Sequence, residues 1–513
     1  MTEFPAPVRG WVTNRNIARN QRDAALVLEN CFPEQDRVRI RKGWKEHNAL
    51  GSKITGLLTY DSGVISEFFA VSGNSVWDVT TAGRPIQISS VSQAISSETV
   101  HSAQFRTPGG HYLYALNGVN FPFLYDGTAW VQVTPVSSPI SLTGVDANQL
   151  IYPFAHKERL FFIEKDSLKA WYLPVKSVGG ALSDLDLSSV FRRGGKLLMG
   201  GTYSTDAGDG VDDFCAFVST NGEVAVYQGS NPGDANAWAL VGLFEIGEPL
   251  GADAWIRAGG DWVIATTEGM VPLSAVFTRD RAALSLASIS RAIESEWARE
   301  VRNRVGSTWR CAKWDQANMA MVSMEVAETS QLTPAQVFVV NVETGAWAPW
   351  PGPNVGLLAV FQGRLYGVAN DVIMEAEAAS SDVGELYTAR LAWWPDDLGG
   401  GANIKRVIKA RGTFVAQTTF APKVSVGVNY SLDFPTQPSA SALSGVDTWD
   451  AGIWDTAVWG GARPEYRRTR WKTISRTGFA VSPQVQVTIG GGAPPEIDVV
   501  ALDVLHETGG AVV

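Results

Sequence analysis

The stretch FPFLYDGTAWVQV, residues 121–133, decides the fold. A first strand ends at Asp126, Gly127 follows, and Trp130 marks a second strand. The Asp-Gly step supplies the positive φ angle that a tight hairpin needs, so the stretch predicts a β-hairpin. Two further stretches have the same layout, with Trp77 and Trp347 marking strands: GNSVWDVTTAG at 73–83 and VFVVNVETGAWAPW at 337–350.

Similar units recur outward from these hairpins at a spacing of about 50 residues, within the range of propeller blades. The seven units are 54–81, 102–133, 151–187, 212–241, 252–277, 308–350 and 356–378. A unit of this length fits a four-stranded blade, so we predict an all-β fold with a β-propeller of about seven blades. A set of β-sandwiches, which also shows hairpins at short intervals, is the alternative.

The regions on either side of the repeats differ from them. The stretch DDLGGGA at 396–402 is typical of a linker, and about five alternating strands follow it, which predicts a β-sandwich. We expect an N-terminal extended segment at 1–50 that joins this platform, a propeller at 51–395, and a C-terminal β-sandwich platform at 396–513.

One segment has helical periodicity. Between 284 and 301, apolar residues recur at steps of three and four and form one stripe: Leu286, Ile289, Ile293, Trp297 and Val301. The sequence therefore predicts one side helix. It packs either on the propeller or on a neighbouring subunit.

Composition excludes several classes of protein. Hydrophobic residues make up 45% of the 513 residues, which excludes global disorder, and charged residues only 18%, too few for a coiled coil. Asp and Glu outnumber Lys and Arg by 52 to 42, whereas a protein that wraps DNA is normally basic. The three widely separated cysteines argue against a disulfide framework or a zinc site and favour folding in a reducing cytoplasm. Uncharged runs are broken by Pro and Gly, so we expect no membrane insertion.

Catalytic motifs are missing from the sequence. It holds no nucleophile elbow, zinc-protease motif, P-loop or dinucleotide-binding fingerprint, and its five histidines have no ligand spacing. The acidic stretch 206–213 lacks the spacing of a calcium loop. We therefore predict no catalytic, cofactor-binding or metal-ligating residue, no cofactor, and no enzymatic activity. A carbohydrate-active propeller is the rival, but the stretch 448–452 is only one imperfect copy of a sialidase-type box.

Two strands carry rows of cations. In the first, Arg37, Arg39 and Arg41 alternate with Val38 and Ile40. Alternation predicts that Val38 and Ile40 face a core while the arginines face outward and meet acidic groups or a neighbouring subunit. A solvated edge strand kept soluble by charge is the alternative.

The second row lies at 466–476. Alternation places Arg468, Arg470, Lys472 and Arg476 on one side of a strand and Trp471 on the other. Four like charges on one face repel each other unless an acidic surface lies opposite. We expect a surface that contacts a neighbouring subunit or an adaptor; the alternative is a face that only aids solubility.

Two motifs are unusual enough to carry a resemblance. The stretch 28–47 reads LENCFPEQDRVRIRKGWKEH, an N-x-F-P followed by R-x-G-W. Near the C-terminus, DTWDAGIWDTAVWGG places Trp449, Trp454 and Trp459 five residues apart, which makes them further interaction candidates. In this order, around propeller-like hairpins and before HETGG at 506–510, the motifs resemble the nozzle proteins of short-tailed bacteriophages, also described as tail tubular or packaged-DNA stabilisation proteins. The helix at 284–301 has no counterpart in that pattern.

The resemblance implies a virion structural protein. Copies of the chain would form a ring, expected to be a hexamer, below the head-to-tail adaptor protein. The ring would conduct phage genomic DNA without sequence readout and carry tail fibre or spike proteins. It would be located in the virion tail after assembly in the bacterial host cytoplasm. A net charge of −10 suits a repulsive lumen. The rivals are a carbohydrate-binding or carbohydrate-degrading propeller and a receptor binder at a tail tip.

Overall fold

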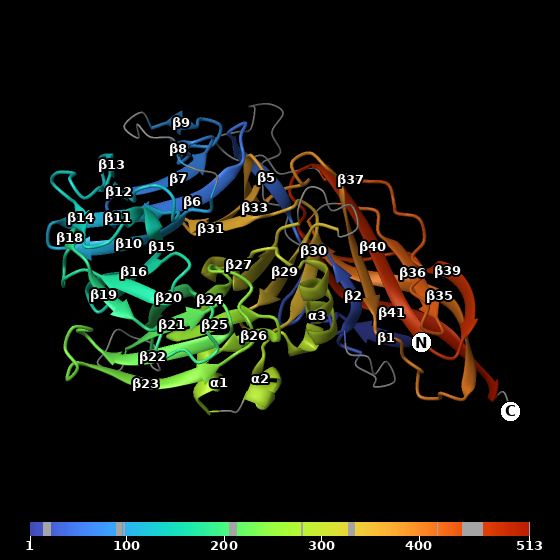
Figure 1. Cartoon of the computed structure of the whole chain (residues 1–513). Coiled ribbons are helices and arrows are strands. Elements are labelled where there is room, and N and C mark those ends of the chain that lie inside the picture. The colour runs from blue at the N-terminus through green and yellow to red at the C-terminus, as the bar shows by residue number, and fades with distance from the viewer. Residues whose placement is uncertain are drawn as a thin grey trace.

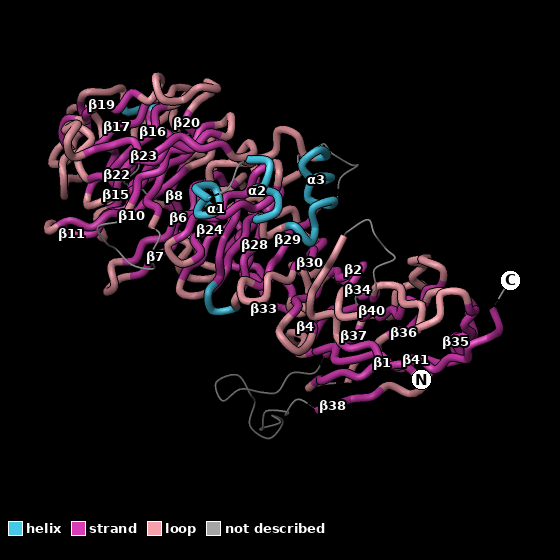
Figure 2. The backbone as a smooth tube through the Cα atoms, turned by 90° about the horizontal axis from the view of Figure 1, so that it is seen from below, coloured by secondary structure: helices cyan, strands magenta, loops and turns pink. Residues whose placement is uncertain are grey.

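Strands dominate the computed structural model of the chain. It describes residues 1–513 except 14–21, 89–94, 96–97, 205–212, 279–280, 327–333, 418, 444–464 and 512–513. Two bodies lie side by side, a ring of small sheets and a sandwich that holds both chain termini (Figures 1 and 2). The all-β prediction is confirmed.

Seven antiparallel sheets in the described residues form the propeller. Blade 1 holds β6 (Ile54–Asp61), β7 (Ser66–Ser72), β8 (Ser75–Asp78) and β9 (Ile86–Gln87); blade 2 holds β10 (His101–Thr107), β11 (Gly110–Leu116), β12 (Phe123–Tyr125) and β13 (Trp130–Gln132); blade 3 holds β15 (Leu150–His156), β16 (Arg159–Glu164), β17 (Lys169–Tyr172) and β19 (Ser183–Asp186); blade 4 holds β20 (Leu197–Tyr203), β21 (Phe214–Ser219), β22 (Glu223–Gly229) and β23 (Trp238–Glu245).

The remaining blades complete the ring. Blade 5 holds β24 (Trp255–Ala258), β25 (Asp261–Thr266) and β26 (Gly269–Pro272); blade 6 holds β27 (Trp309–Trp314), β28 (Met319–Met324), β29 (Gln336–Asn341) and β30 (Trp347–Pro351); blade 7 holds β31 (Leu357–Phe361), β32 (Arg364–Ala369), β33 (Val372–Ala379) and β5 (Gly43–Ala49). The first strand of each blade lines the axis, and β31 of blade 7 packs against β6 of blade 1, which closes the circle.

The hairpin turns follow the chemistry that the sequence predicts. In the turn between β12 and β13, Asp126 Oδ1 accepts hydrogen bonds from the backbone N–H groups of Thr128 and Ala129, both at 2.8 Å. Asn341 accepts bonds from the N–H groups of Glu343 and Thr344 in the equivalent turn of blade 6. A short polar side chain therefore caps the hairpin in both blades.

Blade 7 is closed by a strand from the N-terminal segment, which the sequence assigned to the platform. Strand β5 pairs antiparallel with β33, from Gly43 opposite Ala379 to Ala49 opposite Val372. Trp44 is buried in this pairing. The N-terminal segment 1–50 is therefore divided between the two bodies, because burying Trp44 and pairing the free edge of β33 stabilise this strand in the ring.

Blade 4 begins with β20, outside the unit predicted at 212–241. This strand is not predicted from the sequence, because two glycines interrupt its apolar run, LLMGGTY. A Cβ atom at Gly200 would lie 2.4 Å from Phe154, and one at Gly201 would lie 2.5 Å from Trp262. Side chains of the two neighbouring blades therefore occupy the space that larger residues would need.

Helices take the place of a fourth strand in blade 5. They are α1 (Leu273–Thr278), α2 (Arg281–Ala287) and α3 (Glu294–Asn303). The single helix predicted at 284–301 is broken between α2 and α3. There the Ser288 hydroxyl accepts a hydrogen bond from the Ser290 N–H, and the Ser290 hydroxyl accepts one from the Met270 N–H, which competes with helical hydrogen bonding. The buried Trp297 of α3 packs on the propeller side and donates to the Thr266 carbonyl.

The platform consists of two sheets. One contains β3 (Cys31–Pro33), β4 (Val38–Ile40), β41 (Ile497–Ala511), β35 (Asn403–Ala416), β38 (Glu465–Arg468), β1 (Thr2–Pro5) and β39 (Lys472–Gly478); the other contains β2 (Ala25–Glu29), β34 (Tyr387–Trp393), β40 (Val481–Gly492), β36 (Lys423–Val428) and β37 (Ser441–Leu443). A small parallel pair, β14 (Leu142–Thr143) with β18 (Gly180–Ala181), lies outside both bodies' main sheets.

The predicted boundary at 396 is wrong by about one strand. β34 belongs to the platform, where it pairs with β2 and β40. The supposed linker lies inside this body, since Asp396 is fully buried and exchanges backbone hydrogen bonds with Val481. Gly- and Asp-rich turns within a domain have the same composition as linkers between domains, so composition alone misplaced the boundary.

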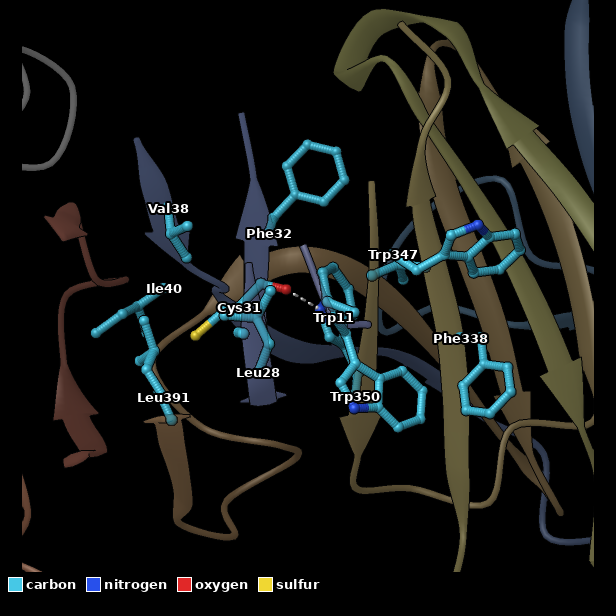
Figure 3. Packing of buried hydrophobic residues seen from close by; sticks show 14 of the residues in the cluster. Trp11, Leu28, Cys31, Phe32, Val38, Ile40, Phe338, Trp347, Trp350 and Leu391 are labelled. Atoms are coloured by element: carbon cyan, nitrogen blue, oxygen red, sulfur yellow. Dashed lines mark hydrogen bonds between the residues drawn. The ribbon is translucent and has the colours of Figure 1, made fainter. Parts of the chain in front are cut away.

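A single hydrophobic core runs from blade 6 into the platform. Figure 3 shows Trp347, Trp350 and Phe338 of blade 6 on one side and Leu28, Cys31 and Phe32 of the platform on the other. Trp350 Nε1 donates a hydrogen bond of 2.7 Å to the Cys31 carbonyl. This continuous core holds the two bodies as one unit.

Candidate functional site

The first cationic row lies at the junction of the two bodies. Val38 and Ile40 are buried, as alternation predicts. Arg37 is partly exposed, Arg39 is mostly buried, and the Arg41 side chain has no exposed surface. The prediction that all three arginines face outward is therefore wrong for Arg41. Strand β4 ends at Ile40, so the alternation no longer applies one residue later.

Arg41 is bound on every side by its own chain. Its two Nη atoms donate to the Asp382 carboxylate at 2.7 and 2.6 Å, and its Nε donates to Asn30 Oδ1 at 2.8 Å. The guanidinium carbon lies 4.1 Å from the centre of the Tyr387 ring and 5.5 Å from that of Trp350. Burial opposes the charge, but the Asp382 carboxylate outweighs it and raises the pKa of Arg41.

Asp382 ties together the two chain segments that cross between the bodies. It lies between β33 of the propeller and β34 of the platform, while Arg41 lies between β4 and β5. The two crossings touch, because a Cβ atom at Gly43 would lie 2.1 Å from the Ser381 carbonyl oxygen. The Arg41–Asp382 pair is therefore a bidentate salt bridge at the point where the chain passes between the propeller and the platform.

The other two arginines of this row also meet acids of their own chain. Arg39 binds Glu377 and lies 3.2 Å from Glu34. Arg37 Nε lies 2.8 Å from Glu34 and 3.3 Å from Asp498. These carboxylates come from β33 of the propeller, from the turn between β3 and β4, and from β41, so this row's charges are matched within one chain.

The second cationic row lies on the outer edge of the platform. Arg468, Arg470 and Lys472 are exposed, and none of them forms an ion pair with a described residue. They do not lie on one continuous strand, since β38 ends at Arg468 and β39 begins at Lys472. Both strands pair with β35, so the row follows the edge of that sheet.

Two residues of this region depart from the predicted arrangement. Ser475 has a φ angle of 52°, which disturbs the alternation, and Arg476 is half-buried, unlike the other three cations. Trp471 is half-buried and stacks under Arg411, whose guanidinium carbon lies 4.5 Å from the ring centre. Arg411 in turn binds Asp503 at 2.7 Å. The unmatched row is therefore Arg468, Arg470 and Lys472.

The third group of predicted residues, Trp449, Trp454 and Trp459, lies outside the described residues. Their role as interaction candidates stays a prediction.

An open groove of about 780 Å³ runs beside the junction. Its lining includes Asp382, Glu29 and Arg390, and the apolar side chain of Leu386 is exposed at its rim. Burial raises the pKa of Glu29, although the Arg390 guanidinium 3.4 Å away opposes this shift. The groove combines apolar and charged lining next to the Arg41–Asp382 pair.

No local pattern points to Asp382 or Glu377 as partners of the arginines. Asp382 is 341 positions away from Arg41 along the chain. Within the described part of the chain, no group of three or more His, Cys, Asp or Glu residues could hold a metal ion. The absence of cofactors and of enzymatic activity stays a prediction. No helix among these residues is long and apolar enough to cross a membrane.

Comparisons with known proteins give no family for the chain and only distant similarity to β-propeller structures. No family model matches the sequence, and a search of curated proteins finds no match. Among solved structures, the β-propeller domain of Cps50 (Swd1) from Myceliophteria thermophila has a TM-score of 0.40 at 9% identity, covering 66% of this chain and 100% of that one. YCF48 from Cyanidioschyzon merolae has a TM-score of 0.31 at 8% identity, covering 65% and 98%. BamB from Moraxella catarrhalis has a TM-score of 0.33 at 12% identity, covering 68% and 93%. The assignment of a β-propeller with a platform rests on the arrangement of the sheets themselves.

Proposed function

We propose that this chain is a structural protein of a virion: the tail nozzle subunit of a short-tailed bacteriophage. Several copies, six by the family resemblance, form a ring below the head-to-tail adaptor, through which the genome passes and on which fibres or spikes are mounted. The observation that carries the proposal is the architecture, a propeller joined by one core to a platform built from both ends of the chain. The resemblance implies a β-propeller with a smaller β platform, and this part of the architecture supports the proposal.

The contact between subunits is assigned to the outer edge of the platform. A closed ring needs heterologous contacts, in which one surface of a subunit meets a different surface of the next. Arg468, Arg470 and Lys472 provide a cationic edge without acidic partners among the described residues, on a chain with a net charge of −10. An acidic surface of the next copy complements this edge.

The ring passes DNA without holding it. An acidic chain gains little from counterion release, which drives most non-specific DNA binding. A filter-binding measurement at moderate salt is expected to find no strong and no sequence-selective affinity. Nanomolar, sequence-dependent binding would contradict a conduit.

Assembly is the direct test. The purified chain is imaged by negative-stain electron microscopy and sedimented, alone and with the adaptor protein of the same virus. We expect rings with a central hole, and assembly that weakens as salt rises, because about 1 M salt shortens the Debye length to roughly 3 Å.

Charge reversal locates the contact. The double variant Arg468→Glu with Arg470→Glu should impair ring assembly while leaving monomer folding intact. Arg84→Glu with Arg106→Glu is the matched control, since both arginines are exposed on the propeller and the change in net charge is the same. A chain that stays monomeric with and without the adaptor would overturn the proposal, and depolymerisation of a polysaccharide would favour the carbohydrate-active alternative.

A further inference from the structure

The larger sheet of the platform has two edges on opposite sides. Strand β35 pairs with β41 on one side and with β38 and β39 on the other. Strands β1 and β4 pair with the far side of β41. Among the described residues, no strand pairs with the outer side of β1 or of β38. The sheet therefore presents β1 and the β3–β4 hairpin at one edge, and β38 with β39 at the other.

The edge of β38 and β39 carries an excess of cations. Its one acid between 465 and 478 is Glu465, which pairs with Arg467. Four further cations of this stretch form no ion pair with a described residue: Arg468, Arg470, Lys472 and Arg476. On the adjacent β35, Arg406 lies opposite Glu507 and Lys409 lies opposite Leu505, so this strand does not offset the excess.

The edge of β1 and the β3–β4 hairpin carries an excess of acids. Glu3 is exposed and forms no ion pair with a described residue, and the Asp36 side chain is 80% exposed. Six acids around this edge meet three cations: Glu3, Glu34, Asp36, Glu377, Glu496 and Asp498 against Arg37, Arg39 and Lys42. The amino group of Met1 leaves the acids in excess, and beyond β1 the charges of Arg9 and Asp23 offset each other.

We propose that neighbouring copies join by these two edges, so that Arg468, Arg470 and Lys472 of one copy face Glu3 and Asp36 of the next. The inference rests on the proposed ring and names the acidic surface of its contact. A heterologous contact needs two different and complementary surfaces on every copy, and the opposite edges of one sheet provide them. Opposite charges on the two edges also disfavour contacts between like edges.

Side chains make this contact, and the backbones of the two copies do not join into one sheet. Strand β1 has four residues and ends at Pro5, and β38 also has four residues. Short edge strands that carry charges or proline resist pairing with a further strand. The contact is therefore ionic, and assembly through it weakens as salt rises.

Charge reversal at each edge, followed by mixing, tests the inference. One variant carries Arg468→Glu with Arg470→Glu, and the other carries Glu3→Lys with Asp36→Lys. Each variant alone has two edges of like charge, so ring formation at about 0.1 M salt should fall at least about tenfold in sedimentation. In an equal mixture, native contacts alternate with contacts of exchanged charge, so rings should form again in sedimentation and negative-stain images.

The control mixture replaces the first variant by Arg84→Glu with Arg106→Glu, which has the same net charge and unchanged platform edges. It should form rings that exclude the second variant. All four reversed residues are exposed, and thermal unfolding of each monomer checks its folding. Glu3→Gln with Asp36→Asn, which removes the charges without reversing them, should weaken assembly less.

The outcomes separate this inference from the proposed function. Normal assembly of both variants at Glu3 and Asp36, or a mixture that forms no rings, would overturn the edge contact and leave the ring itself in place. A wild-type chain that forms no ring, alone or with the adaptor, would overturn the proposed function and this contact with it.

Discussion

The two cationic rows look alike in sequence and differ in the folded chain. At the junction, Arg37, Arg39 and Arg41 meet carboxylates of the same chain, and Arg41 is fully buried. At the platform edge, Arg468 and Arg470 remain exposed and without an ion pair among the described residues. Charge alternation along a strand therefore does not tell whether the charges serve folding or association. That depends on which distant segments lie opposite.

The two rows also differ in energy. A buried pair is strongly coupled, because removing one partner leaves an unpaired charge without water. An exposed cation remains hydrated with or without a partner, so it contributes little to the stability of the monomer. Substitutions should therefore separate the rows clearly, and the following predictions are ordered by the size of the expected effect.

The largest effect is expected for Arg41→Met. The variant leaves the Asp382 carboxylate buried without its bidentate partner, which should lower the free energy of unfolding by about 3–5 kcal/mol. Urea denaturation followed by Trp fluorescence measures the loss. The double variant with Asp382→Leu should recover part of it, because two apolar groups replace two charges. A loss below about 1 kcal/mol in the single variant would contradict a stabilising junction.

Acid should destabilise the propeller independently of the junction. Burial lowers the pKa of His156 in blade 3 from its usual 6.5 to about 4. Between these values the unfolded chain binds a proton that the folded chain excludes, so stability falls as pH falls from 6.5 to 4 and is retained above 6.5. The loss should reach about 3 kcal/mol.

Denaturation midpoints from pH 7 to 4 measure this loss. His156→Gln should flatten the pH dependence, whereas Arg41→Met should keep it at a lower overall stability. An unchanged slope in the His156 variant would place the acid sensitivity elsewhere.

Glu377→Gln should have an intermediate effect. Glu377 accepts a hydrogen bond from Arg39 and has a nearly buried side chain. Loss of its charge should cost about 1–2 kcal/mol, since hydrogen bonds to charged groups exceed neutral ones. Glu375→Gln, on the same strand but paired with the exposed Arg364, should cost less than about 1 kcal/mol. Equal losses in thermal unfolding of the two variants would mean that burial does not separate them.

The smallest effect is expected at the platform edge. Arg470→Ala should change the free energy of unfolding by less than about 0.5 kcal/mol, because the side chain is exposed and without an ion pair to any described residue. Thermal unfolding of the monomer checks this. A loss above about 1 kcal/mol would show that the second row, like the first, stabilises its own chain.

Local signals predicted the repeated part of the fold. The Asp-Gly turn at 126–127 and its counterparts fix hairpins through short-range backbone chemistry, and the spacing of the units gave the number of blades. Long-range pairing was missed. The stretch GWKEHNA of β5 has mixed polarity, and its partner β33 lies more than 300 positions further along the chain, so nothing local assigns it to blade 7.

The candidate site was predicted only in part. Alternation placed Val38 and Ile40 in a core correctly, but it failed at Arg41 because β4 ends after three residues. It also failed near Ser475, where a positive φ angle and a shift in the pairing with β35 disturb the alternation within β39. Asp382 is the carboxylate that pairs with the buried Arg41, and it lies in a loop whose sequence has no periodic pattern that would predict this contact. Charge rows are visible in a sequence, whereas their partners depend on tertiary structure.

The closure of blade 7 by β5 has a consequence for biosynthesis. Residues 43–49 leave the ribosome early, yet their partners in β33 follow roughly 300 residues later, about 15–60 s at common translation rates. Throughout this time the ring stays open, and the early strands of the platform also wait for β41 at the far end of the chain. The pairing of β5 with β33 and the pairing of β1 and β4 with β41 thus form only when translation is nearly complete, whereas blades 1 to 6 are each built from strands that follow one another along the chain.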